Sequence, residues 1–136
     1  MTEGYGADLT GYYQNIRQNG HLRTVDVAQH WNEAVLRTLG LNLDRKTKKK
    51  LGKALPEELA FYLERPFWLL HFRNHNKSDE EFLNEVARRS GSSDPGFARI
   101  PTEAVFHELK AVAGEDVSDA VADMLAPELS ELWQQA

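Results

Sequence analysis

Two stretches of opposite charge have the residue types and spacing that suggest binding chemistry. Residues 44–53 form a basic stretch, and residues 114–123, which lie 70 positions further along, carry only acidic charges. The basic side chains are Arg45, Lys46, Lys48, Lys49, Lys50 and Lys53, and the acidic ones are Glu115, Asp116, Asp119 and Asp123. Lysines can contact phosphates on nucleic acid or an anionic membrane. Opposite charges can also attract neighbouring molecules.

Three interpretations of this charge difference stay open. The two stretches could be solvated faces whose charges drifted independently. They could instead produce weak, salt-sensitive self-association, in which head-to-tail contacts close into a ring or continue as a filament. Electrostatic binding of nucleic acid through residues 45–53 is the third. The net charge of -5 argues against it.

Metal ligation and nucleophilic catalysis find little support in the chain. His71 and His75 have the i, i+4 spacing of helix ligands, but a third ligand and an adjacent general-base Glu are missing. The segment 114–119 lacks the ligand spacing of a calcium loop. Ser90, Ser92 and Ser93 lie outside any Gly-x-Ser-x-Gly elbow. We therefore expect no catalytic residues, no metal and no cofactor.

Glu33 and Glu103 occupy matching places beside two Ala-Val pairs and could form a carboxylate pair. Glutamates at the boundary of a helix core are the commoner explanation, so enzymatic activity is not expected. The chain has 136 residues and no cysteine, which excludes disulfides and thiolate chemistry. It shows no signal peptide and no apolar run of roughly 18 residues. A cytoplasmic protein without membrane insertion is predicted.

Helical signals run through the chain, and no segment has the alternation of a strand. Several residues mark helix boundaries. Expected starts are Asp8 or Thr10, Thr24, Asp44, Ser78 and Pro127, with Pro56 and Pro101 in the first turns of two further helices, and expected ends are Asn19-Gly20, Gly40 and Gly114. These signals predict eight short helices.

The chain also resembles two copies of one unit. Residues 82–136 align without a gap on residues 12–66, so that Glu33-Ala34-Val35 matches Glu103-Ala104-Val105. We predict an all-α fold of two tandem, internally duplicated short helical bundles, about four helices each, packed as one compact unit. The expected divisions are a first repeat at 8–66, an aromatic joint at 67–77 and a second repeat at 78–136.

The joint is rich in aromatic residues, including Phe67, Trp68 and Phe72, and is not a flexible linker. The simpler interpretation is that these side chains hold the two repeats in one core. The alternative is that part of the joint is an exposed anchor for another protein. A pocket between the repeats, where Trp31, Trp68 and Trp133 could gather, would instead suggest a small ligand.

Three segments in order resemble a known bacterial family. They are Asn32-Glu33-Ala34-Val35-Leu36-Arg37-Thr38-Leu39, then Ala54-Leu55-Pro56-Glu57-Glu58-Leu59, then Asp79-Glu80-Glu81-Phe82-Leu83-Asn84-Glu85-Val86-Ala87. Together they resemble the domain-of-unknown-function family 2267 over nearly the whole chain from about Tyr12. The closing Leu125-Ala126-Pro127-Glu128-Leu129 fits a second Leu-Pro-x-x-Leu element with one residue inserted before the proline. The resemblance implies a duplicated helical bundle and carries no established catalytic residues.

The sequence thus favours an uncharacterised, non-enzymatic helical protein that acts as a protein-interaction or scaffold module. The expected partner is another protein or a second copy of the chain. The alternatives are an electrostatic nucleic-acid binder through residues 45–53 and, less favoured, a small-ligand protein.

Overall fold

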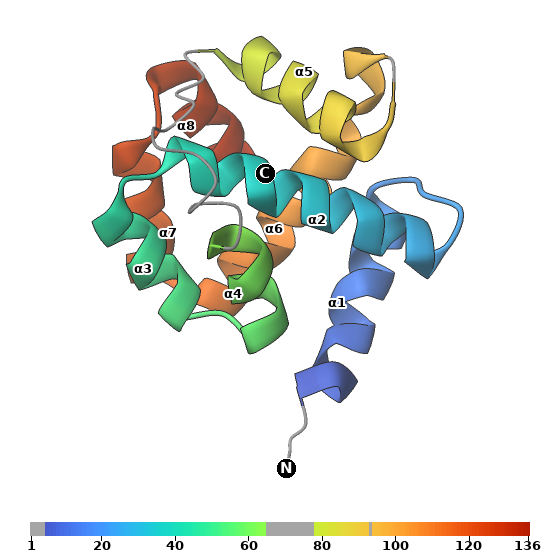
Figure 1. Ribbon diagram of the computed structural model, residues 1–136, viewed down its shortest axis with the longest axis horizontal. Helices are drawn as coiled ribbons and strands as arrows, with labels where there is room; N and C mark the ends of the chain where they lie inside the picture. The colour runs from blue at the N-terminus through green and yellow to red at the C-terminus, as the bar shows by residue number, and fades with distance from the viewer. Residues whose placement is uncertain (1–4, 65–77, 93) are drawn as a thin grey trace.

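The computed structural model describes residues 5–64, 78–92 and 94–136, with side chains from residue 9 onward. These ranges form eight α-helices and one short 3-10 helix, and they contain no strand. The elements are α1 (Tyr5–Asn19), α2 (Val25–Asn42), α3 (Arg45–Lys53), α4 (Glu57–Glu64), α5 (Asp79–Ser90), η2 (Pro95–Phe97), α6 (Arg99–Ala113), α7 (Glu115–Met124) and α8 (Pro127–Gln135) (Figure 1). The predicted all-α class is confirmed.

Side-chain caps begin three of the helices where the sequence predicts them. Thr24 accepts a hydrogen bond from the Val27 amide at 3.1 Å, and Asp44 accepts one from the Thr47 amide at 2.8 Å. Ser78 does the same for the amide of Glu81 at 3.1 Å. Each cap satisfies an amide that has no partner within its helix, which explains why the helix starts there.

Two predicted boundaries are wrong. The first helix starts at Tyr5, before Asp8 and Thr10. The second helix passes through Gly40 and ends at Asn42. Gly40 lies against α4, where a Cβ atom would collide with the carbonyl oxygen of Leu63. This glycine allows two helices to approach closely and does not end one.

The last two helices of the second half begin 70 residues after the last two helices of the first half. Helices α3 and α7 start at Arg45 and Glu115, and α4 and α8 start at Glu57 and Pro127. The buried positions along these helices also repeat at an offset of 70 residues. Buried residues along α3 and α4 are Leu51, Leu55, Leu59 and Leu63, and those along α7 and α8 are Val121, Leu125, Leu129 and Trp133. These correspondences are compatible with the predicted duplication.

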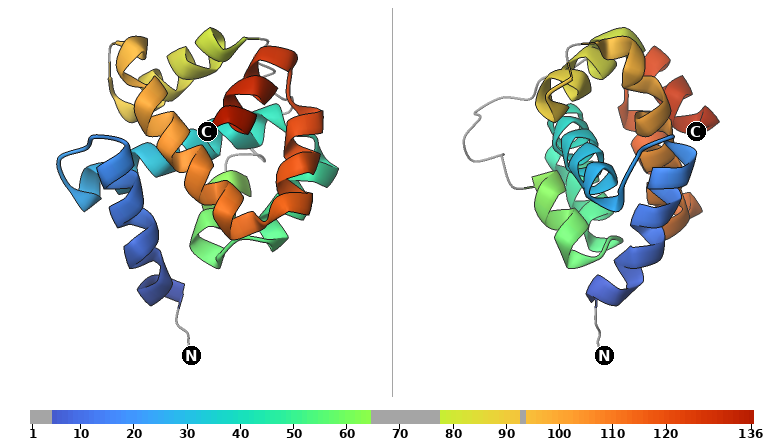
Figure 2. Two further views of the ribbon diagram at one scale, coloured as in Figure 1. Left: turned by 180° about the vertical axis from the view of Figure 1, so that it is seen from behind. Right: turned by 90° about the vertical axis from the view of Figure 1, so that its right-hand side faces the viewer.

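The two halves interleave. Helix α1 packs against α6, and α5 packs against α2, so the first helix of each half contacts the second helix of the other. Helices α2 and α6 contact each other, and so do α3 and α7 (Figures 1 and 2). Both halves therefore contribute to one core, which unites side chains from distant parts of the sequence.

An aromatic cluster fills part of this core. Phe82 of α5 lies 5.7 Å from Phe106 of α6, and Phe106 lies 5.0 Å from Trp133 of α8, between ring centroids. The indole Nε1 of Trp133 donates to the carbonyl of Ser118 at 3.0 Å, which satisfies its polar atom. The division into residues 8–66, 67–77 and 78–136 stays a prediction, because the joint lies outside the described residues.

Candidate functional site

The predicted basic cluster lies on α3, but its six side chains do not share one environment. Lys48 is buried, with 5% of its surface exposed, beside Thr47, Leu51 and Gly52 on the inward side of the helix. The other five are exposed: Arg45, Lys46, Lys49, Lys50 and Lys53. Four of them, at 46, 49, 50 and 53, follow the i, i+3, i+4, i+7 spacing of one helix face. The exposed cations therefore form a continuous row.

The predicted acidic residues form a corresponding row on α7. Glu115, Asp116, Asp119 and Asp123 are all exposed, while Ser118, Val121 and Ala122 are buried on the opposite side. Glu115 and Asp116 stand in the first turn of the helix, where negative charge is favourable.

The fold brings together the two helices that carry these rows. Helices α3 and α7 pack against each other and lie on the same side of the molecule, at the left in Figure 1 and at the right in the left panel of Figure 2. We call the exposed residues of both helices the charged face: Arg45, Lys46, Lys49, Lys50, Lys53, Glu115, Asp116, Asp119 and Asp123. It combines the basic row of α3 with the acidic row of α7.

The predicted aromatic contacts lie outside the described residues. Phe67, Trp68 and Phe72 belong to this stretch, and so do the histidines at 71 and 75. Their roles stay predictions, as does a pocket containing Trp68. Within the described ranges, no three His, Asp or Glu side chains are grouped so that they could hold a metal ion.

A polar network that the sequence analysis did not predict links α1, α2 and α4. Tyr12 donates a 2.6 Å hydrogen bond from its hydroxyl to Asn32 Oδ1, and Asn32 Nδ2 donates to the Tyr13 hydroxyl at 3.4 Å. Tyr13 then donates to Glu58 Oε2 at 2.6 Å. The four side chains form a one-way series of hydrogen bonds that ends at the exposed Glu58 carboxylate.

Burial raises the pKa of both tyrosines in this network. The pKa of Tyr12 is raised first by desolvation and then by the neighbouring Tyr13. The pKa of Tyr13 is raised by desolvation and by its hydrogen bond to Glu58. Both phenols are therefore held in the protonated, donating form. The sequence contains a signal for this network: the positions equivalent to Tyr12 and Tyr13 in the second half are Phe82 and Leu83, so only the first half has hydroxyl groups there.

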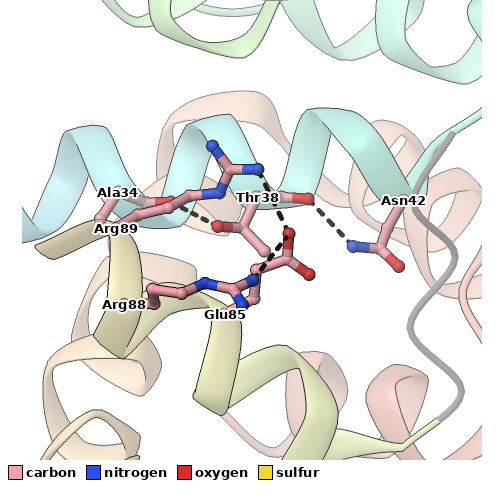
Figure 3. A network of polar contacts seen from close by, with 6 residues as sticks. All are labelled: Ala34, Thr38, Asn42, Glu85, Arg88 and Arg89. Carbon is pink, nitrogen blue, oxygen red and sulfur yellow. Dashed lines mark hydrogen bonds and ion pairs between the residues drawn. The ribbon is translucent and has the colours of Figure 1, made fainter. Parts of the chain in front are cut away.

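A second polar group lies between α2 and α5 (Figure 3). The buried carboxylate of Glu85 lies 3.2 Å from Arg89 Nη2 and 3.7 Å from Arg88 Nη2. On the facing helix, Thr38 donates its hydroxyl to the Ala34 carbonyl, and Asn42 donates to the Thr38 carbonyl. The polar side chains of this interface are thus bonded within their own helices, which allows the helices to pack.

The residues considered for catalysis are also bonded locally. Glu33 forms an ion pair with Arg37 at 2.9 Å, and Glu103 lies 3.9 Å from Arg99, each four residues away on its own helix. Arg99 also binds Asp79 at 2.7 Å, and this hydrogen bond lowers the pKa of the Asp79 carboxyl. The Ser90 hydroxyl donates to the Ala87 carbonyl at 2.9 Å. These contacts serve helix packing and helix ends.

Burial also shifts the pKa of two other side chains. Burial raises the pKa of Tyr62, with the charges of Glu58 and Glu33 adding to the effect. Burial also lowers the pKa of Lys110, whose ammonium donates to the Gln134 carbonyl at 3.1 Å. Both groups lie where one helix packs on another, so these shifts reflect packing.

Comparison with known proteins identifies the family. Among the described helices, none combines the length and apolar character needed to cross a bilayer. No curated protein matches the chain. The model of one family, described as "Uncharacterized conserved protein (DUF2267)", matches residues 11–132, which cover most of both halves and the whole of the charged face. The chain therefore belongs to the DUF2267 family, as its helix and capping motifs predicted.

Proposed function

We propose that this chain is a binding protein without catalytic activity, a protein-interaction or scaffold module that uses the charged face. The observation that carries this proposal is the adjacency of α3 and α7, whose exposed sides bear opposite charges. Complementary charge patterns steer association and select partners. The expected partner is a protein surface with acidic and basic groups side by side.

The polar groups inside the protein support a structural role for these side chains rather than a catalytic one. The phenol of Tyr12 is buried against Asn32, and Glu85 is buried between two arginines. A general acid or base must reach the proton that it transfers in a bound substrate. The Tyr12 bond joins two helices and the Glu85 ion pairs lie within α5, so both serve the packing of the helices.

The test is capture of partners from the native cell extract, followed by mass spectrometry, with the full chain immobilised. The variant Lys46→Glu with Lys49→Glu should lose partners that the unchanged chain retains. The matched control is Arg23→Glu with Gln18→Glu and Gln29→Glu, which alters net charge equally at exposed positions outside α3 and α7. Equal capture by both variants would contradict the proposal.

Binding of nucleic acid through α3 is the second candidate, favoured by the row of exposed lysines. The acidic row of α7 beside it opposes the approach of a phosphate backbone. Mixed-sequence DNA tested at low salt should be retarded by the chain if this candidate holds. Replacing Lys46, Lys49 and Lys50 by Gln should then abolish the shift. Lys48 is not a useful target because it is buried.

A further inference from the structure

The two rows of the charged face carry opposite charges at equivalent positions. Each of four cations on α3 has an anion 70 positions further along, on α7. The matching positions are Arg45 and Glu115, Lys46 and Asp116, Lys49 and Asp119, and Lys53 and Asp123. All eight side chains are exposed. The rows therefore have equal length and complementary charge.

The spacing of the charges allows these rows to match in either direction. Lys46, Lys49 and Lys53 are separated by three and then four residues, as are the aspartates at 116, 119 and 123. If α3 of one copy and α7 of the other run in opposite directions, the matching cations are Lys46, Lys50 and Lys53. Their intervals of four and then three residues equal those of the three aspartates read backwards. Each row is about 10 Å long, at about 1.5 Å per residue. A basic row can thus face an acidic row along its full length.

The face is nearly neutral although the molecule is acidic. It carries five basic and four acidic side chains, whereas the whole chain has a net charge of -5. The net charge is spread over the whole molecule, whereas facing charges of the two rows come into contact, so the local pattern dominates at close approach. A surface with one sign of charge suits nucleic acid, but a balanced surface suits a partner with the same pattern.

We propose that the charged face binds a second copy of this chain, so that α3 of each copy lies against α7 of the other. This rests on the proposed function and names its partner. A two-fold axis makes the two contacts identical, because each surface then faces its own complement. Since α3 and α7 lie side by side, one partner engages both rows. The assembly closes as a dimer and replaces the head-to-tail ring or filament suggested by the sequence.

The dimer depends on ionic strength. Exposed ion pairs are individually weak and are screened by salt. Sedimentation velocity of the full chain should show a dimer, of twice the 15.5 kDa monomer mass, at low ionic strength. It should show the monomer near 1 M salt, where the screening length falls to about 3 Å. No species larger than the dimer should form as the concentration rises.

Charge-reversal variants test the pairing directly. The basic-row variant carries Lys46→Glu, Lys49→Glu, Lys50→Glu and Lys53→Glu. The acidic-row variant carries Asp116→Lys, Asp119→Lys and Asp123→Lys. Each should be monomeric alone, because its two rows then have the same sign. An equimolar mixture should restore a dimer containing one copy of each. A chain carrying both sets should dimerise by itself, and unchanged helical circular dichroism checks that each variant folds.

Three results would overturn the inference: a wild-type monomer at low salt, a dimer that survives reversal of either row, or a mixture that stays monomeric. Failure of this inference can be distinguished from failure of the proposed function. If the wild type is monomeric but reversal of Lys46 and Lys49 still abolishes partner capture, the charged face binds a different protein. If neither association nor capture responds to reversal, both proposals fail.

Discussion

The hydroxyl of Tyr13 on α1 donates a 2.6 Å hydrogen bond to the carboxylate of Glu58 on α4, across 45 residues of sequence. The same hydroxyl accepts a longer bond from Asn32 of α2. One phenol thereby joins three helices of the first half. At the equivalent place in the second half, Leu83 has no polar atom to do this.

Removing one tyrosine hydroxyl should destabilise the fold. Tyr12→Phe leaves the buried Asn32 oxygen without its 2.6 Å donor, so the free energy of unfolding should fall by about 1–3 kcal/mol. Tyr13→Phe should cost about 1 kcal/mol, because water can reach the exposed Glu58. Urea unfolding measures both. Tyr62→Phe is the control and should change stability by less than about 0.5 kcal/mol, since its ring contact with Arg37 is retained.

Stability should decline above about pH 10, the usual pKa of a tyrosine. Tyr12 and Tyr13 have pKa values raised by burial in the folded chain, so the folded state keeps protons that the unfolded state releases. Their stabilising contribution is full below pH 10 and is lost as the pH rises beyond it. The slope is about 1.4 kcal/mol per pH unit for each such tyrosine.

Unfolding free energies measured between pH 9 and pH 11.5 check this dependence. The comparison is a double variant with Tyr12→Phe and Tyr13→Phe, which retains every lysine and arginine. Its stability should fall less steeply with pH than that of the wild type. Identical slopes would show that the two phenols ionise as easily in the folded chain as in the unfolded one.

Gly40→Ala should be strongly destabilising although alanine favours helices. The added methyl group would collide with the Leu63 carbonyl, so α2 and α4 must separate. We expect a loss of about 2–4 kcal/mol in thermal or urea unfolding. Gly11→Ala in α1 is the matched control, since a Cβ there meets no atom within 4 Å. It should stabilise the chain by about 0.5–1 kcal/mol.

The two arginines beside Glu85 should contribute unequally. Arg89→Met removes the closer partner, at 3.2 Å and with 30% of its side chain exposed, and should cost about 1–2 kcal/mol. Arg88→Met removes the more distant partner, at 3.7 Å and 74% exposed, and should cost less than about 0.5 kcal/mol. Urea unfolding of both variants in the same buffer compares them. Equal losses would mean that exposure does not govern these ion pairs.

The sequence alone determined the local features of this protein. Thr24, Asp44 and Ser78 begin helices because each side chain bonds an amide three residues away. Gly91 and Gly114 end helices with φ angles of 87° and 92°, in which a side chain would be strained. Such signals involve only a few neighbouring residues, so they can be predicted without the fold.

Only the tertiary structure decided the features that join distant helices. It kept Gly40 inside α2 because α4 approaches there, and it buried Lys48, one of the six basic side chains considered for binding. It united Tyr12, Tyr13 and Glu58 in one network. It also placed α3 beside α7, which turned two separate charged segments into one face. The sequence assigns charge to each helix, but adjacency depends on how the helices pack in three dimensions.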